Sequence, residues 1–260
     1  MRVLYAGNGP LALKILSWLS DQPIQLAGLV VHPEDRGLNA EELVRQSCLP
    51  DDAVFQGDRM RDPETTSRIG ALKPDLLLSI HFGYILPDII LDLPPQGCVN
   101  LHPGYLPYTR GTYPNVWSIV DDTPAGVTLH YMDRGIDTGD LIARREVEIL
   151  PTDTGHSLYD RLQKAEFELF LDTWPQLLDG QPPRSPQNPE EGSQHRKRDV
   201  DSIDCIDLDD TYRAGDLIDI LRARTFPPYK GAYFLHEGRR IYLRLELAEE
   251  DSDEPEENGQ

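Results

Sequence analysis

The chain has 260 residues, enough for one large domain or a main domain with a small appendage, and 39% of them are hydrophobic, as in globular proteins. Its 45 acidic and 25 basic residues give a formal charge of −20, which disfavours a nucleic-acid partner because phosphate backbones require clustered basic residues. No apolar run approaches the ~20 residues of a membrane span, and the three isolated cysteines favour neither a disulfide framework nor a structural zinc site.

Strand and helix signals alternate from the start of the chain. Four short, continuous apolar runs are typical of strands buried on both faces, and they lie at residues 3–6, 26–31, 75–80 and 98–101. Between the first two runs, Leu11, Ile15 and Leu19 recur at helical spacing. This order indicates an α/β fold with a Rossmann-like, mostly parallel sheet covered by helices.

Two more exposed strands and a long helix are expected next. Residues 125–132 and 141–150 alternate between apolar and polar side chains, and residues 157–178 form an amphipathic helix that Thr154 can cap. Residues 1–7 are too short for a signal peptide and lack a cleavage site, so we expect a cytoplasmic protein.

The composition changes after this unit. Residues 180–192 are rich in proline and glycine, which is typical of a linker or surface loop. A helix near 213–224 and two strands flanking a turn at 236–239 would form a small C-terminal appendage of one helix plus a β-hairpin. The predicted division is a main domain at 1–180, a linker and small subdomain at 181–248, and a disordered acidic tail at 249–260.

A glycine-containing turn follows the first strand. Residues 7–12 read Gly-Asn-Gly-Pro-Leu-Ala, and Ala12 can replace the third glycine of a dinucleotide fingerprint. One interpretation is a nucleotide or phosphate at the N-terminus of the following helix, as in a NAD-binding Rossmann protein. The alternative is an ordinary tight turn between a strand and a helix.

A second motif lies at the end of the run 98–101. Asn100 and His102 are two residues apart, so they share one face and emerge at the edge where ligands of open α/β sheets bind. An amide can donate to a developing oxyanion, and an imidazole can exchange protons near neutral pH. The pair suits acyl transfer, whereas the alternative is a polar strand end with an ordinary hydrogen-bonded histidine.

An acidic loop follows about 35 residues later. Residues 133–140 contain three acids and two glycines, at a spacing that does not fit an EF-hand. A carboxylate here can orient His102 and stabilise its protonated form, or the loop can simply be a solvated hairpin. Because GxSxG, HExxH and P-loop motifs are absent, the residues favour direct acyl transfer with neither a covalent enzyme intermediate nor a metal.

Together these motifs resemble the N10-formyltetrahydrofolate-dependent formyltransferases, which include methionyl-tRNA, glycinamide-ribonucleotide and sugar-nucleotide enzymes. The resemblance rests on Asn100-Leu-His102-Pro-Gly-Tyr-Leu-Pro, on Arg110-Gly111 and on Asp137-Thr-Gly-Asp140, and it extends over residues 1–247. Residues 106–118, 126–131, 194–198 and 221–234 are more similar to the sugar N-formyltransferases, which act on nucleotide-linked amino sugars.

The resemblance implies roles for individual residues. Asn100 would hold the formyl oxygen, His102 would be the catalytic histidine, and Asp137 would be its acidic partner. The co-substrate N10-formyltetrahydrofolate would contact Phe82, Gly83, Tyr84, Ile85, Leu86 and Asp133, although core packing is the alternative for the aromatic and leucine side chains. The nucleotide sugar would contact Asn8, Gly9, Tyr105, Arg110, Tyr113, Asn115, Phe226 and Tyr229.

Two of these assignments are more specific. Arg110 is the first choice for the pyrophosphate, with Asn8 and Gly9 the second, because an arginine fork and a helix N-terminus both suit phosphate. Phe226 or Tyr229 would stack on the base, or would instead anchor the appendage.

The implied protein is a formyltransferase with residues 1–180 as its catalytic domain. It would transfer a formyl group to the amine of a nucleotide-linked amino sugar, with a dTDP- or GDP-linked 4-amino-4,6-dideoxyhexose favoured, for surface polysaccharides such as lipopolysaccharide O-antigen. A homodimer is expected, without a metal, nucleic acid or membrane. The alternatives are a methionyl-tRNA formyltransferase, which would require a larger basic C-terminal domain, a glycinamide-ribonucleotide formyltransferase, and a NAD-binding protein.

Overall fold

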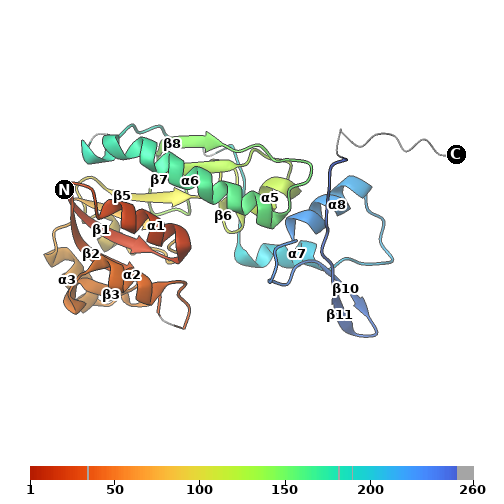
Figure 1. Ribbon diagram of the computed structural model, residues 1–260, viewed down its shortest axis with the longest axis horizontal. Helices are drawn as coiled ribbons and strands as arrows, with labels where there is room; N and C mark the ends of the chain where they lie inside the picture. Colours follow the sequence, from red (N-terminus) through yellow and green to blue (C-terminus); the bar gives the residue numbers. More distant parts are fainter. Residues whose placement is uncertain (34, 181, 189, 251–260) are drawn as a thin grey trace.

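The computed structural model describes residues 1–33, 35–180, 182–188 and 190–250 (Figure 1). A seven-stranded sheet in the order β3-β2-β1-β4-β5-β7-β8 forms its centre. The strands are β1 (Arg2–Gly7), β2 (Gln25–Val31), β3 (Val54–Gln56), β4 (Leu76–Ile80), β5 (Cys98–His102), β7 (Gly126–Tyr131) and β8 (Leu141–Glu146). The first five strands pair in parallel, and β7 runs antiparallel to both of its neighbours, β5 and β8, which confirms the predicted α/β fold with a mostly parallel sheet.

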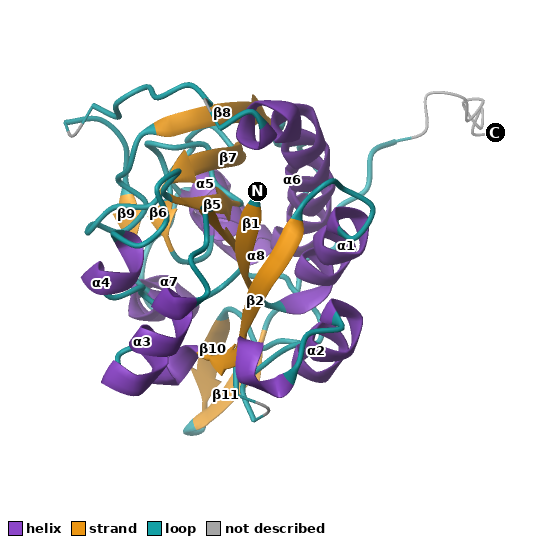
Figure 2. Cartoon of the chain, turned by 90° about the vertical axis from the view of Figure 1, so that its left-hand side faces the viewer, coloured by secondary structure: helices purple, strands orange, loops and turns teal. Residues whose placement is uncertain are grey.

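Helices cover both faces of this sheet (Figure 2). One face carries α1 (Gly9–Leu19), α2 (Ala40–Ser47) and α6 (Gly155–Leu178), and the other carries α3 (Pro63–Ala71) and α4 (Asp88–Leu91). Side chains of β1 alternate between the two cores, with Val3 and Tyr5 in one and Leu4 and Ala6 in the other. Continuous apolar strands are required because both faces are buried.

The predicted long helix begins with a capping box. The Thr154 hydroxyl accepts a hydrogen bond from the Ser157 backbone N–H, and the Ser157 hydroxyl accepts one from the Thr154 N–H. The helix α6 then packs against β7 and carries Leu158, Leu162 and Leu169 into the core. Among the described residues, none of the helices has both the length and the apolar character needed to cross a membrane.

The C-terminal part contains the predicted helix and hairpin. Its elements are β9 (Gln194–His195), α7 (Asp201–Asp204), α8 (Ala214–Ala223), β10 (Tyr233–His236) and β11 (Arg239–Tyr242), with a 3₁₀ turn at Lys197–Val200. The helix α8 contacts α5 (Pro114–Val120), whereas β10 and β11 form an antiparallel hairpin further from the sheet (Figure 1). Of the predicted acidic tail, residues 249–250 are exposed, and 251–260 lie outside the described residues.

The segment that joins the two parts returns across the main unit. We call residues 182–188 and 190–195 the return segment. Ser185 forms an isolated antiparallel bridge with Leu141, and β9 pairs in parallel with β6 (Arg110–Gly111). The proline-rich stretch that the sequence indicates as a linker or loop therefore lies against the loops that follow β5 and β7.

Candidate active site

A cavity of about 1040 Å³ opens at the carboxyl edge of the sheet. From β1, the next strands in the chain, β2 and β3, lie on one side, whereas β4 and β5 lie on the other. The strand order therefore reverses between β1 and β4. Open α/β sheets bind ligands at such a reversal. The cavity wall includes the turn after β1, residues 81–88 after β4, the end of β5, and the loop 132–137.

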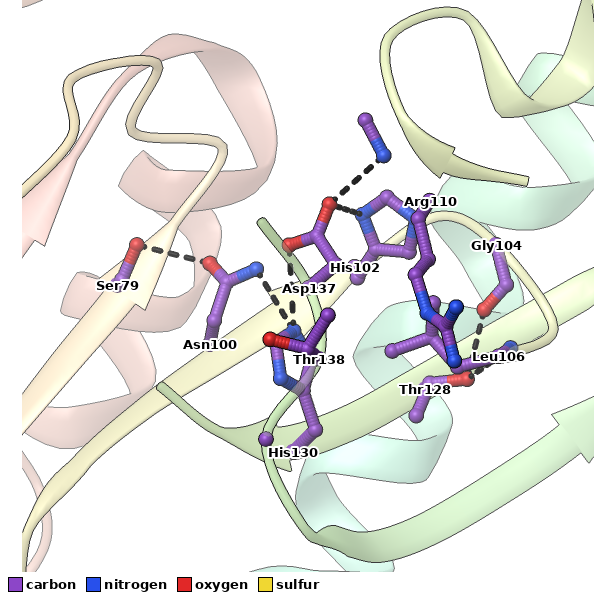
Figure 3. Close-up of polar contacts among 12 residues, drawn as sticks. Ser79, Asn100, His102, Gly104, Leu106, Arg110, Thr128, His130, Asp137 and Thr138 are labelled. Carbon is purple, nitrogen blue, oxygen red and sulfur yellow. Dashed lines mark hydrogen bonds and ion pairs between the residues drawn. The ribbon is translucent and has the colours of Figure 1, made fainter. Parts of the chain in front are cut away.

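Three neighbouring strands place polar side chains in one row (Figure 3). Asn100 on β5 pairs in register with Ser79 on β4 and with His130 on β7. The Ser79 hydroxyl donates to Asn100 Oδ1 at 2.8 Å, and Asn100 Nδ2 lies 3.2 Å from His130 Nε2. These contacts fix the amide orientation and leave one amide N–H for a ligand, because Asn100 lines the cavity.

Asp137 lies between two imidazoles. Its Oδ1 is 3.5 Å from His130 Nε2, its Oδ2 is 3.7 Å from His102 Nδ1, and Oδ2 accepts a 2.9 Å hydrogen bond from the Gly111 N–H. Burial raises the pKa of Asp137, but His102, His130 and the Gly111 N–H together hold that pKa well below its usual range. Asp137 is therefore a carboxylate at neutral pH.

The second ring nitrogen of His102 is also fixed. His102 Nε2 lies 3.1 Å from the Thr109 carbonyl oxygen, and because a carbonyl only accepts hydrogen bonds, Nε2 carries a proton. Nδ1 is thus the nitrogen that can gain or lose a proton, and it faces Asp137. With the ring only 4% exposed, His102 can exchange a proton with a group in the cavity while a carboxylate stabilises its charged form.

His130 is a site residue that our sequence reasoning missed. Its Nδ1 donates to the Tyr131 carbonyl oxygen at 2.8 Å, so Nε2 is the nitrogen facing Asn100 and Asp137. The strand 125–132 was expected, but its position beside β5 was not. The local signal is the alternation of Thr128 and His130, which places both on one face.

A second histidine–carboxylate pair, also missed, lines the same cavity. His81 Nε2 lies 2.9 Å from both oxygens of Glu166, whose side chain is fully buried on α6. Burial lowers the pKa of His81, but the attraction and hydrogen bond to Glu166 outweigh it and raise the pKa above its ordinary value. His81 has a φ of 52°, so the chain turns sharply from β4 into residues 82–87.

Most predicted ligand contacts line the cavity. Those that do are Asn8, Gly9, Phe82, Gly83, Tyr84, Ile85, Leu86, Tyr113, Asn115 and Asp133. Asn115 also donates to the Gly155 carbonyl at 2.8 Å, and Asp133 accepts from the Thr138 hydroxyl at 2.6 Å, so both shape the walls of the cavity.

Four predicted substrate residues lie outside the cavity wall. They are Tyr105, Arg110, Phe226 and Tyr229. Arg110 is 8% exposed, and its guanidinium donates through Nε and Nη2 to Gln187 Oε1 at 3.1 and 2.8 Å, so both of these nitrogens are paired within the protein. The Tyr105 ring packs under the Arg144 guanidinium at 4.7 Å.

Phe226 and Tyr229 adjoin the cavity through another aromatic side chain. Their ring centroids are 5.6 Å apart, and Phe226 is 5.4 Å from Tyr159 of α6, which does line the cavity. Tyr229 is 63% exposed. An aromatic surface from the C-terminal part therefore continues the wall of the cavity outward.

The predicted folate-binding loop offers free backbone groups. In the part of the chain that the structure describes, the N–H and C=O groups of Tyr84, Ile85 and Leu86 have no backbone partners. Phe82 and Leu86 are buried beneath them. A flat ring with amide-like edges fits such a wall, because apolar side chains contact its face and backbone groups pair with its edge. Within the described residues there is no group of three His, Cys, Asp or Glu suited to a metal ion.

Comparisons with known proteins agree with this geometry. Residues 2–173 match the family described as formyl transferase, and residues 199–249 match the N-formyltransferase dimerization C-terminal domain. The methionyl-tRNA formyltransferase of Acetivibrio thermocellus is 30% identical over 96% of this chain and 81% of its own length.

Solved structures extend the similarity over both parts of the chain. A 4-N formyltransferase from Francisella tularensis is 29% identical with a TM-score of 0.81, covering 95% of this chain and 98% of that one. The formyltransferase PseJ from Anoxybacillus kamchatkensis, solved with UDP-4,6-dideoxy-4-formamido-L-AltNAc and tetrahydrofolate, is 28% identical with a TM-score of 0.58, covering 78% and 89%. These matches confirm the resemblance that the motifs indicated.

Proposed function

Because this chain belongs to the formyl transferase family, we propose that it transfers a formyl group from N10-formyltetrahydrofolate to the amine of a nucleotide-linked amino sugar. The observation that carries the proposal is the convergence of Asn100, His102 and Asp137 on one cavity. The similarity to PseJ, which was solved with a UDP-linked formamido sugar and covers 78% of this chain, supports a sugar substrate.

The proposed reaction is a direct acyl transfer. N10-formyltetrahydrofolate supplies the formyl carbon, whose bond to N10 breaks as its bond to the sugar nitrogen forms. The free N–H of Asn100 donates to the formyl oxygen as negative charge develops there. His102 Nδ1 accepts the proton that the attacking amine loses and returns it to N10, and Asp137 stabilises the imidazolium between these events. Much of the remaining rate enhancement comes from holding two substrates together.

For the diphosphate of the nucleotide, we favour the N-terminus of α1. Asn8 precedes this helix, and its Oδ1 accepts a hydrogen bond from the Leu38 N–H at 2.8 Å, which fixes its side chain at the cavity wall. A side chain added at Gly9 would meet nothing within 4 Å, so there is space for a ligand beside the first turn of the helix. Helix N-termini favour anions. The base would stack on the aromatic surface of Phe226 and Tyr229, beyond Tyr159.

A methionyl-tRNA substrate is the second candidate. It is favoured by the 30% identity to the Acetivibrio thermocellus enzyme. The formal charge of −20 disfavours it, because tRNA binding releases counterions only where basic side chains meet the phosphates.

We also propose a homodimer formed through the C-terminal hairpin. Leu235, Ile241 and Tyr242 are 55%, 39% and 37% exposed on β10 and β11, and this part of the chain matches a dimerization domain. Exposed apolar side chains on one hairpin suit a twofold interface. The formylated sugar would be made in the cytoplasm for surface-polysaccharide synthesis.

The test is a panel of acceptors incubated with the purified chain and N10-formyltetrahydrofolate. The panel contains dTDP-, GDP- and UDP-linked 3-amino and 4-amino sugars, methionyl-tRNA and glycinamide ribonucleotide, with product mass as the readout. A mass increase of one formyl group on an amino sugar alone supports the proposal. Formylation of methionyl-tRNA or glycinamide ribonucleotide alone contradicts it, as does formyl release without any acceptor.

A further inference from the structure

Gln187 of the return segment uses its whole amide to join two loops of the site. Its Nε2 donates to the carbonyl oxygens of Asp137 and Gly139 at 2.9 and 2.8 Å. Its Oε1 accepts two hydrogen bonds from the Arg110 guanidinium, at 3.1 and 2.8 Å. Both amide hydrogens and both oxygen lone pairs are thereby paired, so the side chain has a single orientation.

The contacts form a closed ring around Asp137. Arg110 is followed by Gly111, whose N–H donates to Asp137 Oδ2 at 2.9 Å. Gly111 of β6 thus binds the carboxylate of Asp137. Its neighbour Arg110 binds Gln187, which in turn binds the backbone carbonyl of Asp137. The pairing of β6 with β9 ties both to the return segment.

The backbone at Asp137 requires such support. Its φ is 54°, in the left-handed region that non-glycine residues seldom occupy. A residue in that region persists only when its surroundings determine it. The hydrogen bonds of Gln187 to the carbonyls of Asp137 and Gly139 provide that constraint.

We propose that Gln187 and Arg110 are positioning residues, which act on the reaction by holding Asp137 at its distances from His102 and His130. This assigns Arg110 a role behind the site rather than on the pyrophosphate. The proposal rests on the formyl-transfer function for its kinetic readout, but its structural readout is independent of the substrate.

The expected consequence is a loss of turnover without a loss of binding. The contacts of Asp137 to His102 and His130 are 3.7 and 3.5 Å long, so a small displacement moves the carboxylate away from both rings. Misplacement by about 1 Å can lower a rate by roughly 100-fold. Because the imidazoles and the Gly111 N–H hold the pKa of Asp137 down, the same displacement raises that pKa toward its ordinary value.

The test uses Gln187→Glu, with Glu191→Gln as the matched control. Glutamate at 187 keeps the shape of the side chain and its contact with Arg110, but it cannot donate to the two carbonyls and repels them. Glu191 lies in the same segment outside β9, and its side chain is exposed. We expect Gln187→Glu to lower kcat roughly 10- to 100-fold, with both KM values within about twofold of wild type, while Glu191→Gln retains wild-type values.

Three further measurements make the test specific. ¹³C NMR of the Asp137 carboxyl group should show titration at a higher pH in Gln187→Glu than in wild type or Glu191→Gln. Gln187→Asn, which keeps an amide on a shorter side chain, should recover part of the lost kcat, as should Arg110→Lys relative to Arg110→Ala. The proposal would be overturned if Gln187→Glu had the wild-type kcat, if its KM values rose by as large a factor as its kcat fell, or if the titration of Asp137 were unchanged.

The two proposals fail in different ways. If the wild-type chain formylates no amino sugar, the proposed function fails, and the Asp137 titration still tests the positioning role. If wild type is active and Gln187→Glu is equally active, only the positioning role fails.

Discussion

Two histidine–carboxylate clusters face the same cavity, and their geometries differ. Glu166 is fully buried and directs both oxygens at His81 Nε2, each at 2.9 Å. Asp137 divides its oxygens between His102 and His130, at 3.7 and 3.5 Å, and accepts a shorter hydrogen bond, of 2.9 Å, from the Gly111 N–H. We call His81 and Glu166 the closed cluster, because the carboxylate and the imidazole form a short pair. We call His102, His130 and Asp137 the open cluster, because neither imidazole has a short bond to the carboxylate.

This difference separates a structural charge pair from one that can serve a reaction. A short pair with a fully buried carboxylate strongly favours one protonation state, because removing the proton would leave a buried negative charge uncompensated. At Asp137 the carboxylate is not locked to one ring, because its two oxygens face different imidazoles at 3.7 and 3.5 Å. We therefore expect the two clusters to respond differently to the same kind of substitution, in activity and in the pH dependence of stability.

The largest effect is expected when the open cluster is altered. His102→Asn or Asp137→Asn should lower turnover by roughly 10²- to 10⁴-fold, because either change removes proton transfer or its electrostatic support. Turnover is measured with purified protein, and folate binding, followed by thermal shift, should persist. Near-wild-type turnover in either variant would refute the assignment.

The next largest effect is expected at the amide. Asn100→Ala should lower kcat by about 10²- to 10³-fold through loss of a donor to the developing oxyanion. Ser79→Ala is the matched control, because it removes only the hydroxyl that orients Asn100 Oδ1 and should have a smaller effect. Equal losses in the two variants would mean that amide orientation, rather than donation, limits the rate.

The closed cluster should affect stability instead of turnover. In Glu166→Gln the protonated His81 faces a buried neutral amide, which should cost about 1–3 kcal/mol of unfolding free energy. Because the pKa of His81 is raised, this contribution is complete below the unfolded value near 6.5 and is lost as the pH rises through the folded value. Chemical denaturation from pH 5 to 8 measures it.

The neighbouring substitution Glu168→Gln provides the control for that series. Glu168 lies on the same helix, and its side chain is 48% exposed in an ion pair with Arg145. We expect little change in stability from this variant, since exposed pairs contribute about 0–1 kcal/mol. If the difference in unfolding free energy between wild type and Glu166→Gln grew with pH, it would contradict the assigned direction of the His81 pKa.

A change in stability with the opposite pH dependence is expected at the open cluster. Because the pKa of Asp137 is held low, its carboxylate contributes stability above the ordinary pKa of about 3.9, and that contribution is lost as the pH falls through the folded value. The difference between wild type and Asp137→Asn should thus be constant above about pH 5 and shrink in acid. A difference that shrinks toward alkaline pH would show that another group dominates.

The sequence predicted the local parts of this arrangement well. Continuous apolar runs indicated the parallel strands, and the alternation at Asn100 and His102 placed both on one face. The long helix is observed at Gly155–Leu178 against a predicted 157–178. These features depend on residues close together in the chain, where hydrophobic periodicity and capping are read directly.

The site features that could not be predicted from the sequence depend on pairing between segments that are distant in the chain. His130 joins the site because β7 inserts antiparallel beside β5, and Glu166 meets His81 from 85 residues away. Arg110 was assigned to the pyrophosphate because an arginine fork suits phosphate, yet its guanidinium is hydrogen-bonded to Gln187. A proline-rich composition indicates a loop but carries no information about the side chains to which that loop bonds.

The return segment has a consequence for the order in which the protein is made. Strand β6 at residue 110 finds its partner β9 only at residue 194, after the whole sheet and α6 have been synthesised. A nascent chain on the ribosome can therefore assemble the sheet and present Asn100 and His102 while the support for Asp137 is still missing. With the positioning role proposed for Gln187, catalytic competence would be reached only after the return segment has been synthesised.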